Sequence, residues 1–172
     1  MRMRHTPVRL AVTLGFAVGA TMVAAGPSSA EPGPTSALTA THTNCVLTVE
    51  NGKQACFTTA EQSKEYAASA GVLVATLYDW VNYNSQGAHL AIFAPRGCTT
   101  STTDKDYRYA DMPSGWNDKV SSVSTPENGT HCDVWFSSDR NFEGECGNRW
   151  IDKHWDLSQI GCFNRASSFE LS

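Results

Sequence analysis

The pattern of hydrophobic and polar positions changes at about residue 72, and from there to the end of the chain it is typical of β-strands. Short runs of β-branched and aromatic residues are separated by clusters of Gly, Asn, Pro and Ser. The runs are VLVATLYDW (72–80), AHLAIFA (88–94), KVSSVS (119–124), CDVWFSS (132–138) and ASSFEL (166–171). No amphipathic helical period of useful length accompanies them. About eight strands over roughly one hundred residues predict an all-β sandwich or barrel.

The segment before residue 72 has a different character. CVLTVENGKQACF (45–57) predicts a hairpin that turns at Asn51-Gly52, a dipeptide that readily adopts positive φ. AEQSKEYAASA then predicts a helix with Thr58 or Thr59 as its N-cap and Gly71 at its end. We interpret residues 45–71 as a hairpin–helix appendage to a domain at 72–172. Whether it docks on that domain is left open by the sequence.

The N-terminus has the pattern of an export signal. Three arginines precede the apolar run LAVTLGFAVGATMVAA (10–25), and small residues stand at 28 and 30. We expect residues 1–30 to be a signal peptide, residues 31–44 a flexible linker, and the protein to be secreted and extracellular. The formal net charge is −4, and it becomes −7 when the three arginines of the signal are removed. An acidic chain does not favour nucleic acid or membrane partners and suits a cation better.

All six cysteines lie after the expected signal peptide, at positions 45, 56, 98, 132, 146 and 162. An even number in an exported chain predicts three disulfides, with fifteen possible pairings. Proximity favours Cys45–Cys56, and the repeat described next suggests Cys98–Cys132 and Cys146–Cys162. The spacing of cysteines and histidines does not predict a zinc site.

An internal repeat relates residues 76–122 to residues 135–168. LYDWVNYNSQG (77–87) and FSSDRNFEGE (136–145) each place an Asn–aromatic pair before a glycine. NDKVSS (117–122) and FNRASS (163–168) close the two copies with paired serines. A repeat of this kind indicates that one structural unit is used twice.

These motifs resemble the βγ-crystallin superfamily over about residues 74–172. Its Greek key carries an aromatic, four residues, a second aromatic, any residue and Gly, and its calcium-binding members end each key with Asn/Asp-Asn/Asp-x-x-Ser/Thr-Ser. NDKVSS matches that ending fully. Three positions depart from the pattern: Ser85 replaces the first key's Gly, with Gly87 nearby; Ser137 replaces the second key's first aromatic; Phe163 replaces the first Asn/Asp of the second ending.

The resemblance implies a βγ-crystallin-like sandwich of two four-stranded Greek keys, at about residues 74–124 and 131–172, related by a pseudo-twofold axis. We expect it to be monomeric. The implied core consists of Leu77, Leu90, Ile92, Phe93, Val120, Val123, Val134, Phe142, Ile160 and Phe169, covered by Trp116, Trp150 and Trp155.

The resemblance also implies two calcium sites, each shared between the keys. One would use Asp118 and Ser167 and the other Asn164 and Ser121. Carbonyl oxygens of Asp79 and Ser138 would join them, and Asn117 would support Asp118 without touching the ion. Because calcium prefers charged oxygens, we expect the Asp118 site to bind it more tightly. The alternative is that both endings are only turn formers, whose Asn, Asp and Ser side chains bond their own backbone.

The features together predict a secreted, non-enzymatic, calcium-binding protein. The alternative is an extracellular protease inhibitor or toxin-like effector, since microbial metalloproteinase inhibitors and a killer-toxin-like protein share this fold. Its candidate reactive loop is the polar segment at 99–114, and its partner would be an extracellular protease. A hydrolase is not favoured, because the acidic residues Asp133, Asp139, Glu143 and Glu145 fall across a hairpin turn and no nucleophile and base are assembled.

Overall fold

The computed structural model describes residues 44–127 and 129–172. The expected signal peptide and the expected linker up to residue 43 lie outside the described residues. Over the described part of the chain, no helix has the length and apolar character needed to cross a bilayer.

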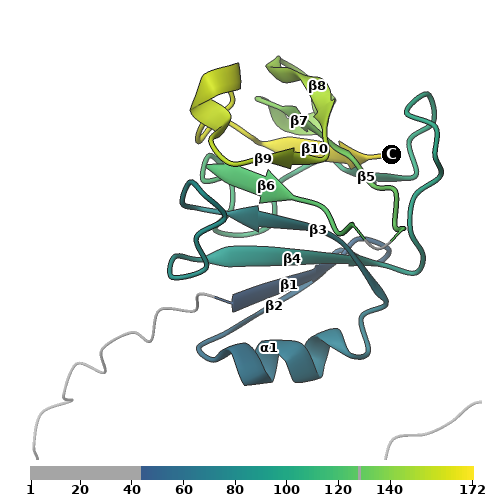
Figure 1. Ribbon diagram of the computed structural model, residues 1–172, viewed down its shortest axis with the longest axis vertical. Helices are drawn as coiled ribbons and strands as arrows, with labels where there is room; N and C mark the ends of the chain where they lie inside the picture. The colour runs from purple at the N-terminus through teal and green to yellow at the C-terminus, as the bar shows by residue number, and fades with distance from the viewer. Residues whose placement is uncertain (1–43, 128) are drawn as a thin grey trace, which may run out of the picture. The chain divides into compact units, whose positions relative to one another are not determined.

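The described residues form mostly β-structure with one α-helix (Figure 1). The strands are β1 (Asn44–Thr48), β2 (Lys53–Phe57), β3 (Val72–Tyr78), β4 (His89–Ala94), β5 (Tyr107–Tyr109), β6 (Ser122–Ser124), β7 (Val134–Ser137), β8 (Cys146–Ile151), β9 (Lys153–His154) and β10 (Ser168–Leu171). The helices are α1 (Ala60–Ala67) and the short 3-10 helices η1 (Arg140–Phe142) and η2 (Leu157–Ile160).

The strands make two sheets, and each sheet contains one strand from the other half of the chain. The first sheet has the order β2-β1-β4-β3-β6-β9, and the second has the order β5-β10-β7-β8. β3 to β6 are the first Greek key and β7 to β10 the second, so the third strand of each key, β5 or β9, pairs in the sheet of the other key. This arrangement confirms the expected sandwich of two Greek keys.

The N-terminal hairpin extends the first sheet. β1 runs parallel to β4, with Asn44 opposite His89 and Thr48 opposite Phe93. It thereby covers the edge of β4, whose backbone groups would otherwise remain unpaired. The hairpin turns through a four-residue loop between Thr48 and Lys53, in which Gly52 has a φ of 67°. A disulfide joins β1 to β2 through Cys45 and Cys56.

The helix α1 follows the hairpin and has the expected N-cap. The side chain of Thr59 accepts a hydrogen bond from the backbone N–H of Gln62 at 3.3 Å. At the end, Gly71 has a φ of 104°, and a Cβ there would lie 2.3 Å from the carbonyl oxygen of Ala94. Glycine is therefore required where the chain leaves the helix and enters β3.

The buried core lies between the two sheets and agrees with most of the expected residues. Leu77, Leu90, Ile92, Val120, Val123, Val134 and Phe169 are fully buried. Phe93, Phe142 and Ile160 are only half-buried. Trp116 is buried, whereas Trp155 is 47 % exposed and covers little of the core. The largest buried side chain that the sequence did not predict is Phe136, at 0 % exposed, which pairs with Phe169 across β7 and β10.

Candidate metal centre

Two six-residue endings, which we call the hooks (117–122 and 163–168), face each other across the pseudo-twofold axis. The backbone N–H of Asp118 donates to the carbonyl of Ala166 at 3.1 Å, and the N–H of Asn164 donates to the carbonyl of Val120 at 3.0 Å. Each hook is therefore held by the backbone of the other. This reciprocal pairing places residues of both keys in each half-site.

The second residue of each hook has a left-handed backbone. Asp118 has a φ of 55° and Asn164 a φ of 50°. Among side chains other than glycine, Asn and Asp adopt this region most readily. The backbone alone therefore accounts for the residue type at these two positions, and both residues are exposed.

The two serines of each hook have different roles. Ser122 donates to the carbonyl of Trp80 at 2.6 Å and accepts from the N–H of Tyr83 at 3.1 Å. Ser168 does the same with the carbonyl of Asp139 and the N–H of Phe142, at 2.7 and 3.1 Å. The second serine thus fastens the folded hairpin of its own key, a role that the sequence analysis missed. The first serine of each hook, Ser121 or Ser167, is therefore the one that can serve as a candidate ligand.

The folded hairpins repeat the same backbone strain. Asn82 and Tyr83 have φ values of 60° and 55°, and Asn141 and Phe142 have values of 58° and 65°. Two consecutive residues with positive φ bend the hairpin sharply onto its own sheet, and an aromatic residue there is uncommon. In both keys the second serine of the hook stabilises this bend, because its hydroxyl accepts from the backbone N–H of the aromatic residue.

The departure at Ser85 is resolved by Gly87. A Cβ on Gly87 would lie 2.3 Å from Asp79 Oδ1 and 2.9 Å from the indole of Trp80. A Cβ on Gly144 would likewise lie 2.2 Å from Ser138 Oγ and 2.4 Å from Asp139 Oδ2. Gly87 is therefore the structural counterpart of Gly144, and the first hairpin is two residues longer, because Gly87 stands four positions after Tyr83 whereas Gly144 stands two after Phe142.

The structure brings together one of the two predicted ligand sets. The hydroxyl of Ser121 lies 2.7 Å from the carbonyl oxygen of Asp79 and 3.0 Å from Asn164 Oδ1. A serine hydroxyl has one proton, so it can satisfy only one of these two acceptors at a time. Three oxygens that share one proton form a partial shell for a hard cation, which binds hydroxyl, carbonyl and amide oxygens. We call this set the Ser121 half-site.

Two buried polar atoms of the β3–β4 hairpin, which supplies the Asp79 carbonyl of the half-site, are unpartnered. Asp79 Oδ1 and His89 Nδ1 are buried and have no hydrogen-bond partner among the described residues. Burial lowers the pKa of His89 and outweighs the nearby Asp79 carboxylate, which would raise it. Unpartnered buried atoms are uncommon in folded proteins and are often found where a ligand binds.

The other set, Asp118 with Ser167 and Ser138, is less closely assembled. The Nδ2 of Asn117 donates to Asp118 Oδ2 at 2.8 Å, and the supporting role of Asn117 in a metal site stays a prediction. Ser167 is held by its backbone, whose N–H donates to the carbonyl of Ser137 at 2.9 Å. Within the described residues, its hydroxyl makes no hydrogen bond to Asp118 or Ser138. Nor do the described residues contain a cluster of three or more His, Cys, Asp or Glu side chains arranged for a metal.

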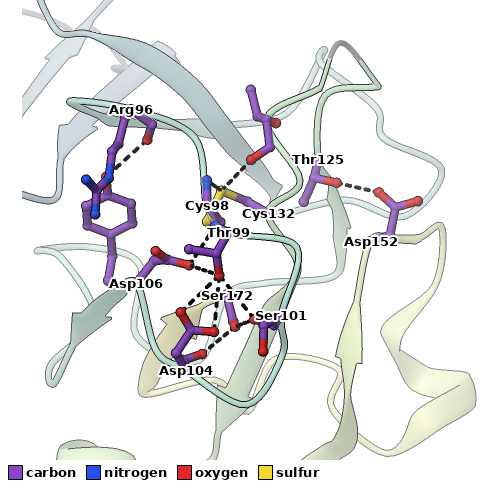
Figure 2. Close-up of a disulfide and its surroundings, with 12 residues drawn as sticks. Arg96, Cys98, Thr99, Ser101, Asp104, Asp106, Thr125, Cys132, Asp152 and Ser172 are labelled. Carbon is purple, nitrogen blue, oxygen red and sulfur yellow. Dashed lines mark hydrogen bonds between the residues drawn. A yellow bond between two sulfur atoms is a disulfide. The ribbon is translucent and has the colours of Figure 1, made fainter.

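The three disulfides join the pairs expected from the sequence: Cys45–Cys56, Cys98–Cys132 and Cys146–Cys162. Figure 2 shows the second of these at the start of the segment 99–114. There the hydroxyl of Thr99 contacts the carboxylates of Asp104 and Asp106, at 3.0 and 3.3 Å for the nearer oxygens. These contacts fold the first half of the segment onto itself.

The second half of the segment 99–114 is not a loop. Residues 107–109 form β5 and pair with β10, and Glu170 of β10 accepts from Lys105 at 2.9 Å and from Arg108 at 2.8 Å. Met112 and Pro113 are buried. Only the part before β5 has the exposure of a reactive loop, and inhibition by this segment stays a prediction.

Comparison with known proteins gave matches to solved structures alone. No protein-family model and no curated protein matches the chain. A structure described as "Evolution of the eye lens beta-gamma-crystallin domain fold" is 22 % identical, with a TM-score of 0.41 over 60 % of this chain and 91 % of that one. A βγ-crystallin from an archaeon is 19 % identical, with a TM-score of 0.38 over 59 % of this chain and 100 % of that one. The N-terminal domain of Protein S is 15 % identical, with a TM-score of 0.38 over 58 % of this chain and 94 % of that one.

The fold is assigned from the topology and the hydrogen bonds, and not from these structural matches. Third strands are exchanged between two Greek keys, each key has a bent hairpin fastened by the second serine of its hook, and the two hooks bond each other reciprocally. Residues 72–172 therefore have the βγ-crystallin-like fold that the sequence motifs predict.

Proposed function

We propose that this protein is a secreted, non-enzymatic, calcium-binding βγ-crystallin-like protein. The observation that supports this function is the Ser121 half-site, where a hydroxyl, a carbonyl and an amide oxygen from two keys converge with a single proton between them. An ion there would satisfy the acceptor that the hydroxyl leaves unpaired. The hook at Asp118 offers a full negative charge to a second ion, shared with Ser167 and a carbonyl of Ser138.

The consequence of ion binding would be a more stable fold outside the cell. A ligand that binds only the folded state stabilises it by RT ln(1 + [L]/Kd), which is ~2.7 kcal/mol at a hundredfold excess over Kd. Sites with one carboxylate or none belong to the weak extracellular range of about 10⁻⁵ to 10⁻³ M. Three disulfides are in keeping with an oxidising environment.

Calorimetric titration of the chain from residue 31 with calcium tests this function. We expect heats that fit one or two sites and a melting temperature higher in millimolar calcium than in chelator. Magnesium is the matched control, because it demands smaller and more regular octahedral coordination and should give little effect. No heat and no change in melting temperature with calcium would show that the hooks only shape the turns.

A further inference from the structure

The pseudo-twofold axis provides an internal comparison between the two folded hairpins. Trp80 and Asp139 are equivalent, because their carbonyls accept from Ser122 and Ser168 respectively. Phe163 and Asn117 are equivalent as the first residues of the two hooks. One of the two symmetry-related sites, each formed by the hairpin of one key and the hook of the other, thus has large apolar side chains where the other site has an acid and an amide.

These apolar side chains are not used by the core. Trp80 is 51 % exposed and Phe163 is 41 % exposed. The symmetry-related site forms in the same way with Asp139 and Asn117 in their places, so the fold does not need rings at these positions. Single exposed apolar residues are ordinary, but a group of them around a hollow indicates a binding surface.

Trp80 and Phe163 line one hollow of 310 Å³ beside the Ser121 half-site. Its wall also includes Val81, Asn82 and Asn84. The backbone of Trp155 lies beside this wall, because its carbonyl accepts from the N–H of Asn82 at 2.7 Å. Two of the four large hydrophobic side chains that are exposed in the described residues, Trp80 and Phe163, therefore line this one hollow.

The indole of Trp80 is positioned by the chain beneath it. Gly87 leaves room for the ring, since a Cβ there would lie 2.9 Å from its Cδ2. Asn84 Oδ1 accepts from the N–H of Gln86 at 2.9 Å, which fixes the amide and leaves its Nδ2 able to donate. Rigid rings and oriented amides reduce the entropy that a binding site loses when it orders around a ligand.

The chemistry of the wall selects the kind of ligand. Asp79 is the one ionisable side chain among the residues that line the hollow, so the wall has no basic group to attract an anion, and its rings and amides favour a neutral ligand. Aromatic rings accept the C–H face of a sugar ring, and amide and hydroxyl groups bond its hydroxyl edge. The volume is at the lower limit of the ~300–1,000 Å³ of small-ligand sites, whereas a protein partner would need about 800 Å² of contact on this side. We propose that this hollow, the Trp80–Phe163 hollow, binds a neutral carbohydrate.

The test uses variants that copy the symmetry-related site. Trp80→Asp and Phe163→Asn install the residues found at 139 and 117, so both should fold with melting temperatures close to that of the wild type. Val72→Ser is the control, because Val72 is 39 % exposed and begins β3 at the end away from Trp80. The probes are soluble oligomers of α-linked glucose, β-linked glucose, mannose, xylose and N-acetylglucosamine.

Binding is measured by calorimetry and saturation-transfer NMR, in calcium and in chelator. We expect at least one oligomer to bind the wild type and the Val72→Ser variant equally. Trp80→Asp and Phe163→Asn should each weaken that binding about tenfold, or ~1.4 kcal/mol. Binding in either buffer supports the hollow as the site, so a protein without calcium affinity would leave this inference intact.

Three results would overturn it. The first is that no oligomer binds the wild type in either buffer. The second is that an oligomer binds and neither hollow variant weakens it. The third is that sedimentation shows a wild-type dimer that both hollow variants convert to monomer, because a second copy of the chain would then cover the hollow.

Discussion

The two hooks differ by one charge, and exchanging the acid and the amide isolates what that charge does. The variants are Asp118→Asn and Asn164→Asp. Both positions are exposed and have positive φ, and both residue types tolerate that backbone. In chelator, each exchange should therefore change the free energy of unfolding by less than about 0.5 kcal/mol, the usual range for surface substitutions.

In calcium, the two variants should move in opposite directions. Stabilisation of ~2.7 kcal/mol per site at a hundredfold excess over Kd corresponds to a rise of roughly 10 °C in a domain of this size. Removing the carboxylate of Asp118 should eliminate at least half of the calcium-dependent rise in melting temperature, because hard cations prefer charged oxygens. Asn164→Asp should increase the rise, since it adds a charge next to the hydroxyl of Ser121 and the carbonyl of Asp79.

The assay is thermal unfolding followed by circular dichroism, in millimolar calcium and in chelator. Asp118→Ala is the companion variant, because alanine is strained at a φ of 55° and should lower stability by ~1–2 kcal/mol in both buffers. It measures the backbone role of the hook separately from ion binding. The reasoning is refuted if Asp118→Asn keeps the full calcium-dependent rise, or if Asn164→Asp leaves that rise unchanged.

Two further predictions concern the hydroxyls and the pH dependence. In chelator, Ser121→Ala should lower the free energy of unfolding by about 1–2 kcal/mol, because it removes the one donor that the Asp79 carbonyl and Asn164 Oδ1 share. Ser167→Ala should cost about 0.5 kcal/mol or less. Urea unfolding of both variants checks this, and equal costs would contradict it. The pKa of Asp133 is raised above its usual 3.8, mainly by burial and secondly by the neighbouring Asp152 carboxylate. The folded chain therefore holds this proton more tightly than the unfolded chain. The resulting stabilisation is present below pH 3.8 and is lost as the pH rises through the raised pKa. Asp133→Asn should therefore flatten this part of the pH profile of unfolding relative to the wild type, and parallel profiles would show that the native and unfolded chains hold the proton equally.

The features that the sequence predicted well are those with a local physical signal. Strands β3, β4, β6, β7 and β10 fall within the alternating or β-branched runs, and the hairpin and the N-cap at Thr59 follow from turn and capping residues. The hooks were visible because Asn and Asp mark left-handed positions and paired serines recur at a fixed distance. These signals depend on neighbouring residues only.

The missed features depend on contacts between distant segments. β8 reads as Gly, Asn and Arg between Cys146 and Trp150, and it becomes a strand through its pairing with β7. β5 is three residues long and lies in a segment that the sequence marked as a loop. The apolar hollow at Trp80 was not predicted either, although the replacement of an Asn/Asp by Phe163 was a signal in the sequence that pointed to it.

The exchange of third strands determines the order in which the chain can complete its structure. The first sheet lacks β9 until residues 153–154 are available, and the second lacks β10 until residues 168–171 have joined β5. Neither key therefore has a finished sheet of its own, and the last residues of the chain pair with a strand about sixty residues earlier. Contacts of such long range slow folding, because loop closure must precede their stabilising effect. We expect the two keys to be acquired together in one late step, so a ribosome-bound or truncated chain that ends before residue 168 should remain unfolded as a whole.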